Sequence, residues 1–169
     1  FIFVLICFQG FLGWYMVTSG LIQRVDVSHY RLSIHLIMAF IILSLIFWNY
    51  LKLNIPNNSK YKINSLIPII FLLLIYLQII MGAFVSGMDA GRLYNTWPMM
   101  GETYFPNDNN FYNLFKLSAF DDPSLVQFIH RNLAYLILIF YFFIFYFIFM
   151  LGNKKLLKPI LFIGFTLLL

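Results

Sequence analysis

Long apolar segments constrain this chain more than any other feature. A membrane-spanning helix needs about 20 consecutive, mostly apolar residues, and the sequence holds four such segments and the beginning of a fifth. We expect helices over about 1–21, 30–51, 66–87 and 124–151, and a further helix that begins near Pro159. Hydrophobic residues make up 62% of the chain and charged residues only 10%, whereas soluble domains carry about 25% charged residues. The predicted fold is therefore all-α, a polytopic integral membrane helical bundle.

The two ends of the chain predict that it is a fragment. It begins at Phe1 without a signal-peptide pattern and stops at Leu169 within an apolar run. Its one cysteine, Cys7, lies in an apolar segment, and a single cysteine cannot form an intrachain disulfide. The net charge of +5 comes from basic residues in the expected loops, so the expected partner is membrane lipid and not nucleic acid.

The lysines of the loops predict the orientation in the membrane. Loops 52–65 and 152–158 each hold three lysines and no acidic residue, whereas loops 22–29 and 88–123 contain acidic residues. Because positive charge is retained on the inner side, we place the first two loops inside and the other two outside. The six lysines are Lys52, Lys60, Lys62, Lys154, Lys155 and Lys158.

Two helical hairpins of the chain resemble each other. His35 and His130 occupy equivalent positions in the second and fourth predicted helices, and each is followed four residues later by alanine. In the first and third helices, glutamine is followed four residues later by glycine. We interpret the hairpins as a parallel repeat about an axis along the membrane normal, in which glycine and glutamine serve helix packing. The repeated positions are Gln9 and Gln78, Gly13 and Gly82, His35 and His130, and Ala39 and Ala134.

The repeated histidines are the main candidates for a functional site. At a rise of about 1.5 Å per residue, both lie roughly 10 Å below the outer ends of their helices. A histidine in a membrane helix either bonds a neighbouring helix or marks a functional site. Of the possible sites, haem fits better than zinc, since haem takes one or two protein ligands and no Cys, Asp or Glu lies beside either histidine to complete a tetrahedral set.

Further polar residues lie near the outer ends of the histidine helices. Arg31 precedes His35 by one turn and Arg131 follows His130 directly; each is expected either to bind a haem propionate or to reach lipid phosphate. We expect His29 to be a solvated loop residue. Asp122, followed by a proline, is the expected N-cap of the fourth helix.

Three segments of the sequence resemble the haem A synthase family. The long outer loop with its two flanks, GAFVSGMDAGRLYNTWPMMGETYFP, resembles the family's loop signature in its mitochondrial and alphaproteobacterial form. The segment VQFIHRNLAYLIL resembles the histidine helix after that loop, and GWYMVTSGL with VSHYRLSIHL resembles the preceding hairpin. The likeness covers nearly the whole chain, and the loop is its most specific part.

The resemblance implies a pseudo-symmetric protein of eight helices in two four-helix bundles. The chain would supply the third to seventh helices, with 1–65 ending the N-terminal bundle and 66–169 beginning the C-terminal bundle. His35 would be the catalytic residue and iron ligand at the substrate haem O, and His130 would bind the iron of a resident haem b. Arg31 and Arg131 would complete the haem-binding residues. The partner histidines and a glutamate required in the family would lie outside the chain, so the fragment alone should be inactive.

The implied reaction is oxidation of the C8 methyl group of haem O to a formyl group, which yields haem A for cytochrome oxidase. The implied partners are haem O synthase as supplier of haem O, an electron donor, cytochrome oxidase assembly factors and a second copy of the same protein. The membrane would be a bacterial plasma membrane or the mitochondrial inner membrane.

Two other functions share part of this pattern. An electron-transfer membrane cytochrome b would have the histidine helices, but it does not predict the aromatic outer loop. A transporter with repeated hairpins predicts helices broken near the bilayer centre, whereas the polar residues here lie near the outer face.

Overall fold

The computed structural model describes residues 1–18, 27–54, 64–152 and 154–168. These residues form α-helices and short 3-10 helices, and no β-strand occurs among them. The prediction of an all-α fold is therefore confirmed.

The helices begin and end close to the predicted positions. The third is predicted to the residue, the second extends three residues beyond its expected end, and the fourth is shifted by one residue. Positions 19–21, which were expected to continue the first helix, lie outside the described residues. The helices are α1 (Ile2–Thr18), α2 (His29–Asn54), α3 (Leu66–Gly87), α4 (Pro123–Met150) and α5 (Lys154–Leu168).

The predicted start of the last helix is wrong. Helix α5 begins at Lys154 and contains Pro159, so the three lysines assigned to the inner loop lie in its first turns. Proline lacks a backbone N–H and removes one hydrogen bond, to the carbonyl four residues earlier. Pro159 is the sixth residue of α5, past the first four amides, which have no intrahelical partner, so α5 lacks one hydrogen bond at this point. Pro68 differs, because it is the third residue of α3, where no intrahelical hydrogen bond is lost.

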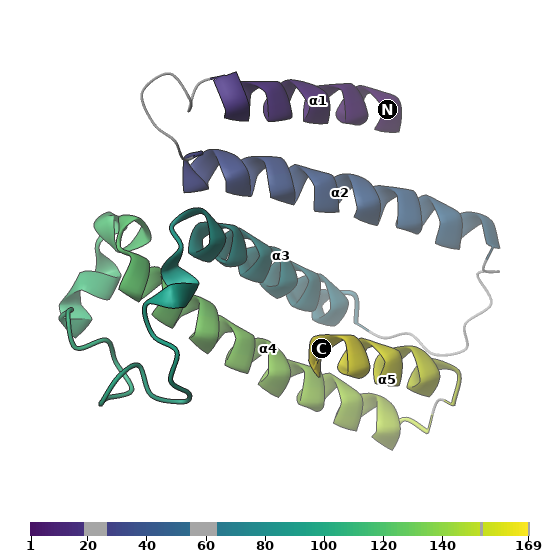
Figure 1. Ribbon diagram of the computed structural model, residues 1–169. Coiled ribbons are helices and arrows are strands. Elements are labelled where there is room, and N and C mark those ends of the chain that lie inside the picture. Colours follow the sequence, from purple (N-terminus) through teal and green to yellow (C-terminus); the bar gives the residue numbers. More distant parts are fainter. Residues whose placement is uncertain (19–26, 55–63, 153, 169) are drawn as a thin grey trace.

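Helices α1 to α4 lie side by side in chain order, and α5 packs back along α4 (Figure 1). The start of α2, the end of α3 and the start of α4 meet at one end of the molecule, where the long loop 88–122 is folded over them (Figure 1). This loop contains three short 3-10 helices: η1 (Ala90–Arg92), η2 (Phe111–Phe115) and η3 (Leu117–Asp121). The predicted outer residues are thus gathered at one end.

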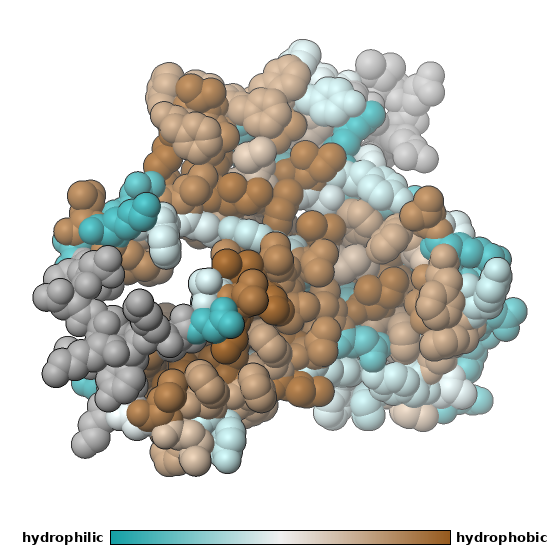
Figure 2. Space-filling model, turned by 180° about the vertical axis from the view of Figure 1, so that it is seen from behind, coloured by the Kyte–Doolittle hydropathy of each residue, from teal (hydrophilic) through white to brown (hydrophobic). Residues whose placement is uncertain are grey.

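The outer surface of the bundle is apolar. Helices α2, α3 and α4 are each long and apolar enough to cross a membrane, and α1 is a shorter apolar helix within the described residues. Large side chains such as Trp14 (61% exposed) and Ile139 (68% exposed) lie on this surface, and Figure 2 shows hydrophobic residues over most of one face. The prediction of a polytopic membrane protein is confirmed.

Two apolar clusters hold the second half of the chain together. Near the long loop, Met81 and Phe84 of α3 pack with Val126 of α4. At the other end, Tyr141 of α4 packs with Ile160 of α5, and the Tyr141 hydroxyl donates a hydrogen bond to the Ile160 carbonyl at 3.0 Å. The two clusters secure α4 at both ends.

Helices α2 and α3 are in close contact at Gly87, the last residue of α3. A Cβ atom at this position would lie 2.9 Å from both Cα and Cβ of His29. The neighbouring atoms belong to the start of α2, not to the end of a flexible side chain, so an added methyl group would force the helices apart.

We predict that Gly87→Ala lowers the free energy of unfolding by about 1–3 kcal/mol, the usual cost of overpacking. Gly10→Ala is the matched control, because a Cβ at Gly10 meets nothing within 4 Å; it should leave stability unchanged or slightly higher, since alanine favours helix. Thermal unfolding of the purified proteins in detergent measures both effects. Equal stability of the two variants would contradict the close contact.

Candidate functional site

His35 lies between α2 and α1, with its ring against two residues of α1. The Gln9 amide nitrogen is 3.3 Å from His35 Nε2, and it donates a hydrogen bond to the His35 main-chain carbonyl at 3.0 Å. A Cβ added at Gly13 would lie 3.0 Å from His35 Cε1. The imidazole thus fills the space that the missing side chain of glycine leaves between the helices.

His130 has the same surroundings between α4 and α3. The Gln78 amide nitrogen is 3.3 Å from His130 Nε2, and a Cβ at Gly82 would lie 3.4 Å from His130 Cε1. The sequence analysis interpreted these glutamines and glycines as packing residues. The structure shows that they do join neighbouring helices, and that the group they contact is the repeated histidine.

Both histidines keep a ring nitrogen without a protein partner. Nδ1 of His35 and Nδ1 of His130 are buried and make no hydrogen bond. A buried polar atom without a partner is costly and often marks a place where a ligand or water belongs. The pair of rings therefore has the property expected of ligand-binding histidines.

The donor set suits haem better than a bare metal ion. Among the described residues, no group of three or more His, Cys, Asp or Glu side chains could hold a metal ion. A haem iron already has four porphyrin nitrogens and takes only one or two ligands from protein. His35 and His130 lie on α2 and α4, which are separated by α3 (Figure 1).

The two arginines of the predicted site have different surroundings. The Arg31 guanidinium lies over the Tyr15 ring, with 5.0 Å from Cζ to the ring centroid. Arg131 donates hydrogen bonds to the Tyr94 and Thr96 carbonyls at 2.5 and 2.8 Å. Arg131 thus holds the long loop in this structure, and the assignment of both arginines to haem propionates stays a prediction.

Polar residues of α4 bind the long loop on the helix turns that flank His130. Gln127 donates to the Tyr94 carbonyl at 2.9 Å. The Tyr104 hydroxyl donates to Asn132 at 2.5 Å, and the Trp97 indole N–H donates to the Tyr135 hydroxyl at 2.7 Å. The sequence analysis missed these α4 residues, although their polar character in an apolar helix is the signal that marks them.

Asp122 confirms the predicted start of α4. Its carboxylate accepts hydrogen bonds from the backbone amides of Ser124 and Leu125, both at 3.0 Å, and Asn109 of the loop donates to its other oxygen at 3.0 Å. Burial alone would raise the pKa of Asp122, but the hydrogen bonds from Leu125, Ser124 and Asn109 hold it below the usual value. The cap is therefore a carboxylate that also anchors the loop.

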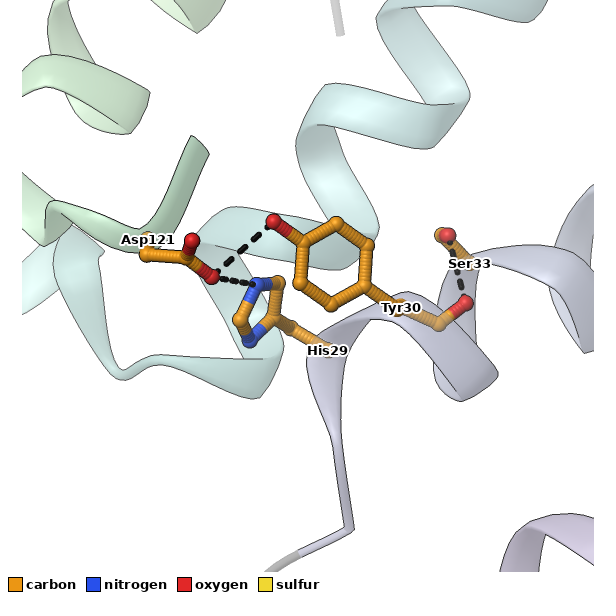
Figure 3. Close-up of polar contacts among 4 residues, drawn as sticks. All are labelled: His29, Tyr30, Ser33 and Asp121. Atoms are coloured by element: carbon orange, nitrogen blue, oxygen red, sulfur yellow. Dashed lines mark hydrogen bonds and ion pairs between the residues drawn. The ribbon is translucent and has the colours of Figure 1, made fainter. Parts of the chain in front are cut away.

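His29 is not the solvated loop residue that we expected. It is the first residue of α2, its side chain is only 16% exposed, and its Nε2 lies 3.6 Å from a carboxylate oxygen of Asp121. The Tyr30 hydroxyl donates to the same oxygen at 2.9 Å (Figure 3). Burial follows from packing, since the His29 ring meets the Phe84 ring edge to face with centroids 4.9 Å apart. These contacts join the start of α2 to η3 of the long loop.

Comparisons with known proteins agree with this arrangement. The model of a family described as cytochrome oxidase assembly protein (COX15-CtaA) matches residues 1–169. The haem A synthase of Pelagibacter ubique (strain HTCC1062) is 52% identical over 139 residues, which cover 82% of this chain and 41% of that protein. The haem A synthase of Rickettsia felis is 39% identical over an alignment of 173 positions, which covers 98% of this chain and 50% of that protein.

A third relative, the haem A synthase of Rickettsia bellii (strain RML369-C), is 38% identical, with 99% of this chain and 51% of that protein covered. The chain thus spans about half the length of these relatives, or less. No solved structure matches the chain.

We predict that Asp122→Ala lowers the free energy of unfolding by about 0.5–2 kcal/mol, the usual cost of losing an N-cap, whereas Asp122→Asn retains most of it. A carboxylate whose pKa is lowered by folding stabilises the protein above the unfolded pKa of about 3.9, and this contribution is lost as the pH falls through the folded pKa. The advantage of the native protein over Asp122→Asn should therefore vanish in acid. Unfolding curves from about pH 7 to about pH 3 test this; an advantage that persists in acid would contradict the capping carboxylate.

Proposed function

The chain belongs to the cytochrome oxidase assembly protein family, and we propose that it forms haem-binding hairpins of a haem A synthase. The observation that carries this proposal is the pair of histidines with matching glutamine and glycine contacts. Its support from comparison is the 52% identity to the haem A synthase of Pelagibacter ubique. The proposed reaction is oxidation of the C8 methyl group of haem O to a formyl group.

The two histidines take different haems in this proposal. His35, between α1 and α2, binds the iron of the substrate haem O and places the reacting methyl group. His130, between α3 and α4, binds the iron of a resident haem b. In this division, residues 1–65 belong to one bundle and residues 66–169 to the other, and α2 packs along α3 where the bundles meet.

The haem supplies the redox chemistry when it is bound, and the residues of the chain orient it and exclude water. The buried Nδ1 atoms of His35 and His130 support this role. Arg31, one turn from His35 toward the outer end, is placed to pair with a propionate group. The loop over α4, held by Arg131 and Trp97, closes the outer side of the second hairpin.

The remaining partners follow from this reaction. Haem O is delivered by haem O synthase, and assembly factors of cytochrome oxidase receive haem A. Oxidation of a methyl to a formyl group removes four electrons, so the reaction needs an external oxidant in addition to the electron donor. The protein lies in a bacterial plasma membrane or the mitochondrial inner membrane, with the long loop on the outer side.

We predict that replacing the two histidines in the full-length protein has separate effects. His130→Ala should remove most of the haem b from the purified protein, because an axial ligand is lost. His35→Ala should leave haem b largely in place and lower the conversion of haem O to haem A. Haem extraction followed by chromatography measures both pigments.

His29→Ala is the control for this pair, because His29 contacts Asp121 and not the repeated site; it should retain haem b and haem A production. Unchanged haem A in both site variants would refute the enzymatic role of these histidines. Equal loss of haem b in both would refute the division between the two haems and favour an electron-transfer cytochrome.

We predict that the long loop faces the outside of the membrane. In a Cys7→Ala background, Leu117→Cys places a thiol on the loop at a position that is 86% exposed. A membrane-impermeant maleimide should label it in intact bacterial cells or mitoplasts, and Lys52→Cys at the inner end of α2 should be labelled only after the membrane is broken. The reverse pattern would invert the topology.

A further inference from the structure

One stretch of the long loop, residues 94–100, follows α4 along its side, and we call it the loop tip. Its contact furthest along α4 is the Trp97 indole N–H, which donates to the Tyr135 hydroxyl at 2.7 Å. Arg131, one turn before Tyr135, donates to main-chain carbonyls of the same stretch. Figure 1 shows this part of the chain, between η1 and η2, beside the first half of α4. The loop tip therefore runs toward the membrane.

The register of α4 gives the depth of this contact. A membrane-spanning helix needs about 20 residues in the hydrocarbon layer, and α4 ends at Met150, just before the lysines at the start of α5. Because lysines mark the end of a membrane span, counting about 20 residues back from Met150 places the other edge of the layer near Arg131. Tyr135 then lies about 6 Å inside this edge, at a rise of about 1.5 Å per residue. The Trp97 indole therefore reaches the boundary of the acyl chains.

Beyond Tyr135, the same face of α4 is apolar and exposed. Ile139 is 68% exposed, Phe142 59% and Tyr146 63%, and their spacing is that of residues that share one face of a helix. At about 100° per residue, His130 lies on the opposite side of α4, where it contacts α3. This face belongs to the apolar outer surface of the bundle, so the loop tip covers the outer end of a face that meets lipid.

The main chain of the loop tip meets the condition for entering lipid. Irregular backbone is tolerated at membrane depth only where its polar groups find partners in the protein. The Tyr94 carbonyl accepts hydrogen bonds from Gln127 and Arg131 at 2.9 and 2.5 Å. The Thr96 carbonyl accepts from Arg131 at 2.8 Å, and the Met99 carbonyl accepts from the Thr96 hydroxyl at 2.9 Å. These three carbonyls therefore have partners that do not depend on water.

The exposed side chains from Trp97 to Met99 are apolar. Trp97 is 75% exposed and Met99 is 39% exposed, and Pro98 lies between them. Tryptophan is enriched where headgroups meet acyl chains, because its ring is large and apolar while its N–H is polar. The N–H of Trp97 is paired with α4, so the ring is free to contact hydrocarbon.

We propose that the loop tip is a re-entrant segment that enters the outer leaflet beside α4. Trp97, Pro98 and Met99 contact the acyl chains of phospholipids, and Arg131 holds the segment in place through its carbonyls. A charged side chain at membrane depth commonly pairs with backbone carbonyls, and the hydrogen bonds of Arg131 go to those of the tip. The rest of the loop, including Leu117, remains on the water side.

The test uses spin labels on the full-length protein in phospholipid nanodiscs, with the native cysteines replaced. Met99→Cys carries the label on the loop tip, Ile139→Cys is the lipid reference and Leu117→Cys, at a position that is 86% exposed, is the water reference. Oxygen concentrates in hydrocarbon and a nickel chelate in water, so the ratio of their collision rates with a label reports its surroundings. We expect the ratio at Met99→Cys to match that at Ile139→Cys and to exceed that at Leu117→Cys several-fold.

Two results would overturn the re-entrant segment. A ratio at Met99→Cys equal to that at Leu117→Cys would place the loop tip in water. Low collision rates with both oxygen and the nickel chelate at Met99→Cys would show that another part of the protein covers the tip.

Arg131→Met tests what holds the loop tip in the membrane. Without the guanidinium, carbonyls of the tip lose a donor and have no water to replace it in lipid. The tip should therefore leave the leaflet, and the ratio at Met99→Cys should fall several-fold toward that at Leu117→Cys, which should itself stay the same. An unchanged ratio at Met99→Cys would overturn the anchoring by Arg131.

Arg92→Met is the matched control for this variant. The Arg92 side chain is exposed and lies 3.7 Å from Asp89 of the same loop, so its loss should leave the ratio at the tip unchanged. If Arg131→Met does not fold, Gln127→Leu replaces it, because it removes the other side-chain donor to the Tyr94 carbonyl. The same fall in the ratio is then expected, and an unchanged ratio would overturn the role of these donors.

Discussion

Polar groups inside a membrane protein must find partners within the protein, because lipid offers none. In this chain one contact used twice meets part of this constraint, the glutamine amide of one helix against the histidine ring of the next, while Nδ1 of each histidine keeps no protein partner. Glycine one turn along the first helix leaves room for the ring. The contact therefore sets both the spacing of each helix pair and the place where the most reactive side chains lie.

At the outer end of the bundle, polar groups of the long loop also find their partners within the protein. The long loop brings carbonyl oxygens close to the membrane, and Gln127 and Arg131 of α4 donate to them. Burial and the hydrogen bond to Asp108 raise the pKa of Tyr94, so the phenol remains a neutral donor in the loop. The loop is thereby an ordered cover over α4, in the half of the molecule that we assign to the resident haem.

Much of this arrangement could be predicted from the sequence, and the failures have physical causes. The apolar segments predicted the ends of α2, α3 and α4 to within three residues, since helix length in a membrane is set by bilayer thickness. The start of α5 was wrong because proline was taken as a helix start, whereas the helix begins five residues earlier and contains Pro159. The repeat predicted the paired histidines, but it could not show that Gln9 also bonds a main-chain carbonyl. His29 was assigned to solvent because its burial depends on Phe84 and Asp121, which are distant in sequence.

Two neighbouring acidic residues of the loop contact different helices. Asp121 holds the start of α2 through Tyr30 and His29, and Asp122 begins α4 as its N-cap. The peptide bond between them therefore links a residue that holds α2, in the first half of the repeat, to the residue that begins α4, in the second half. An insertion between Asp121 and Asp122 would shift the start of α4 relative to the start of α2. Length variation among related proteins should accordingly stop short of this dipeptide.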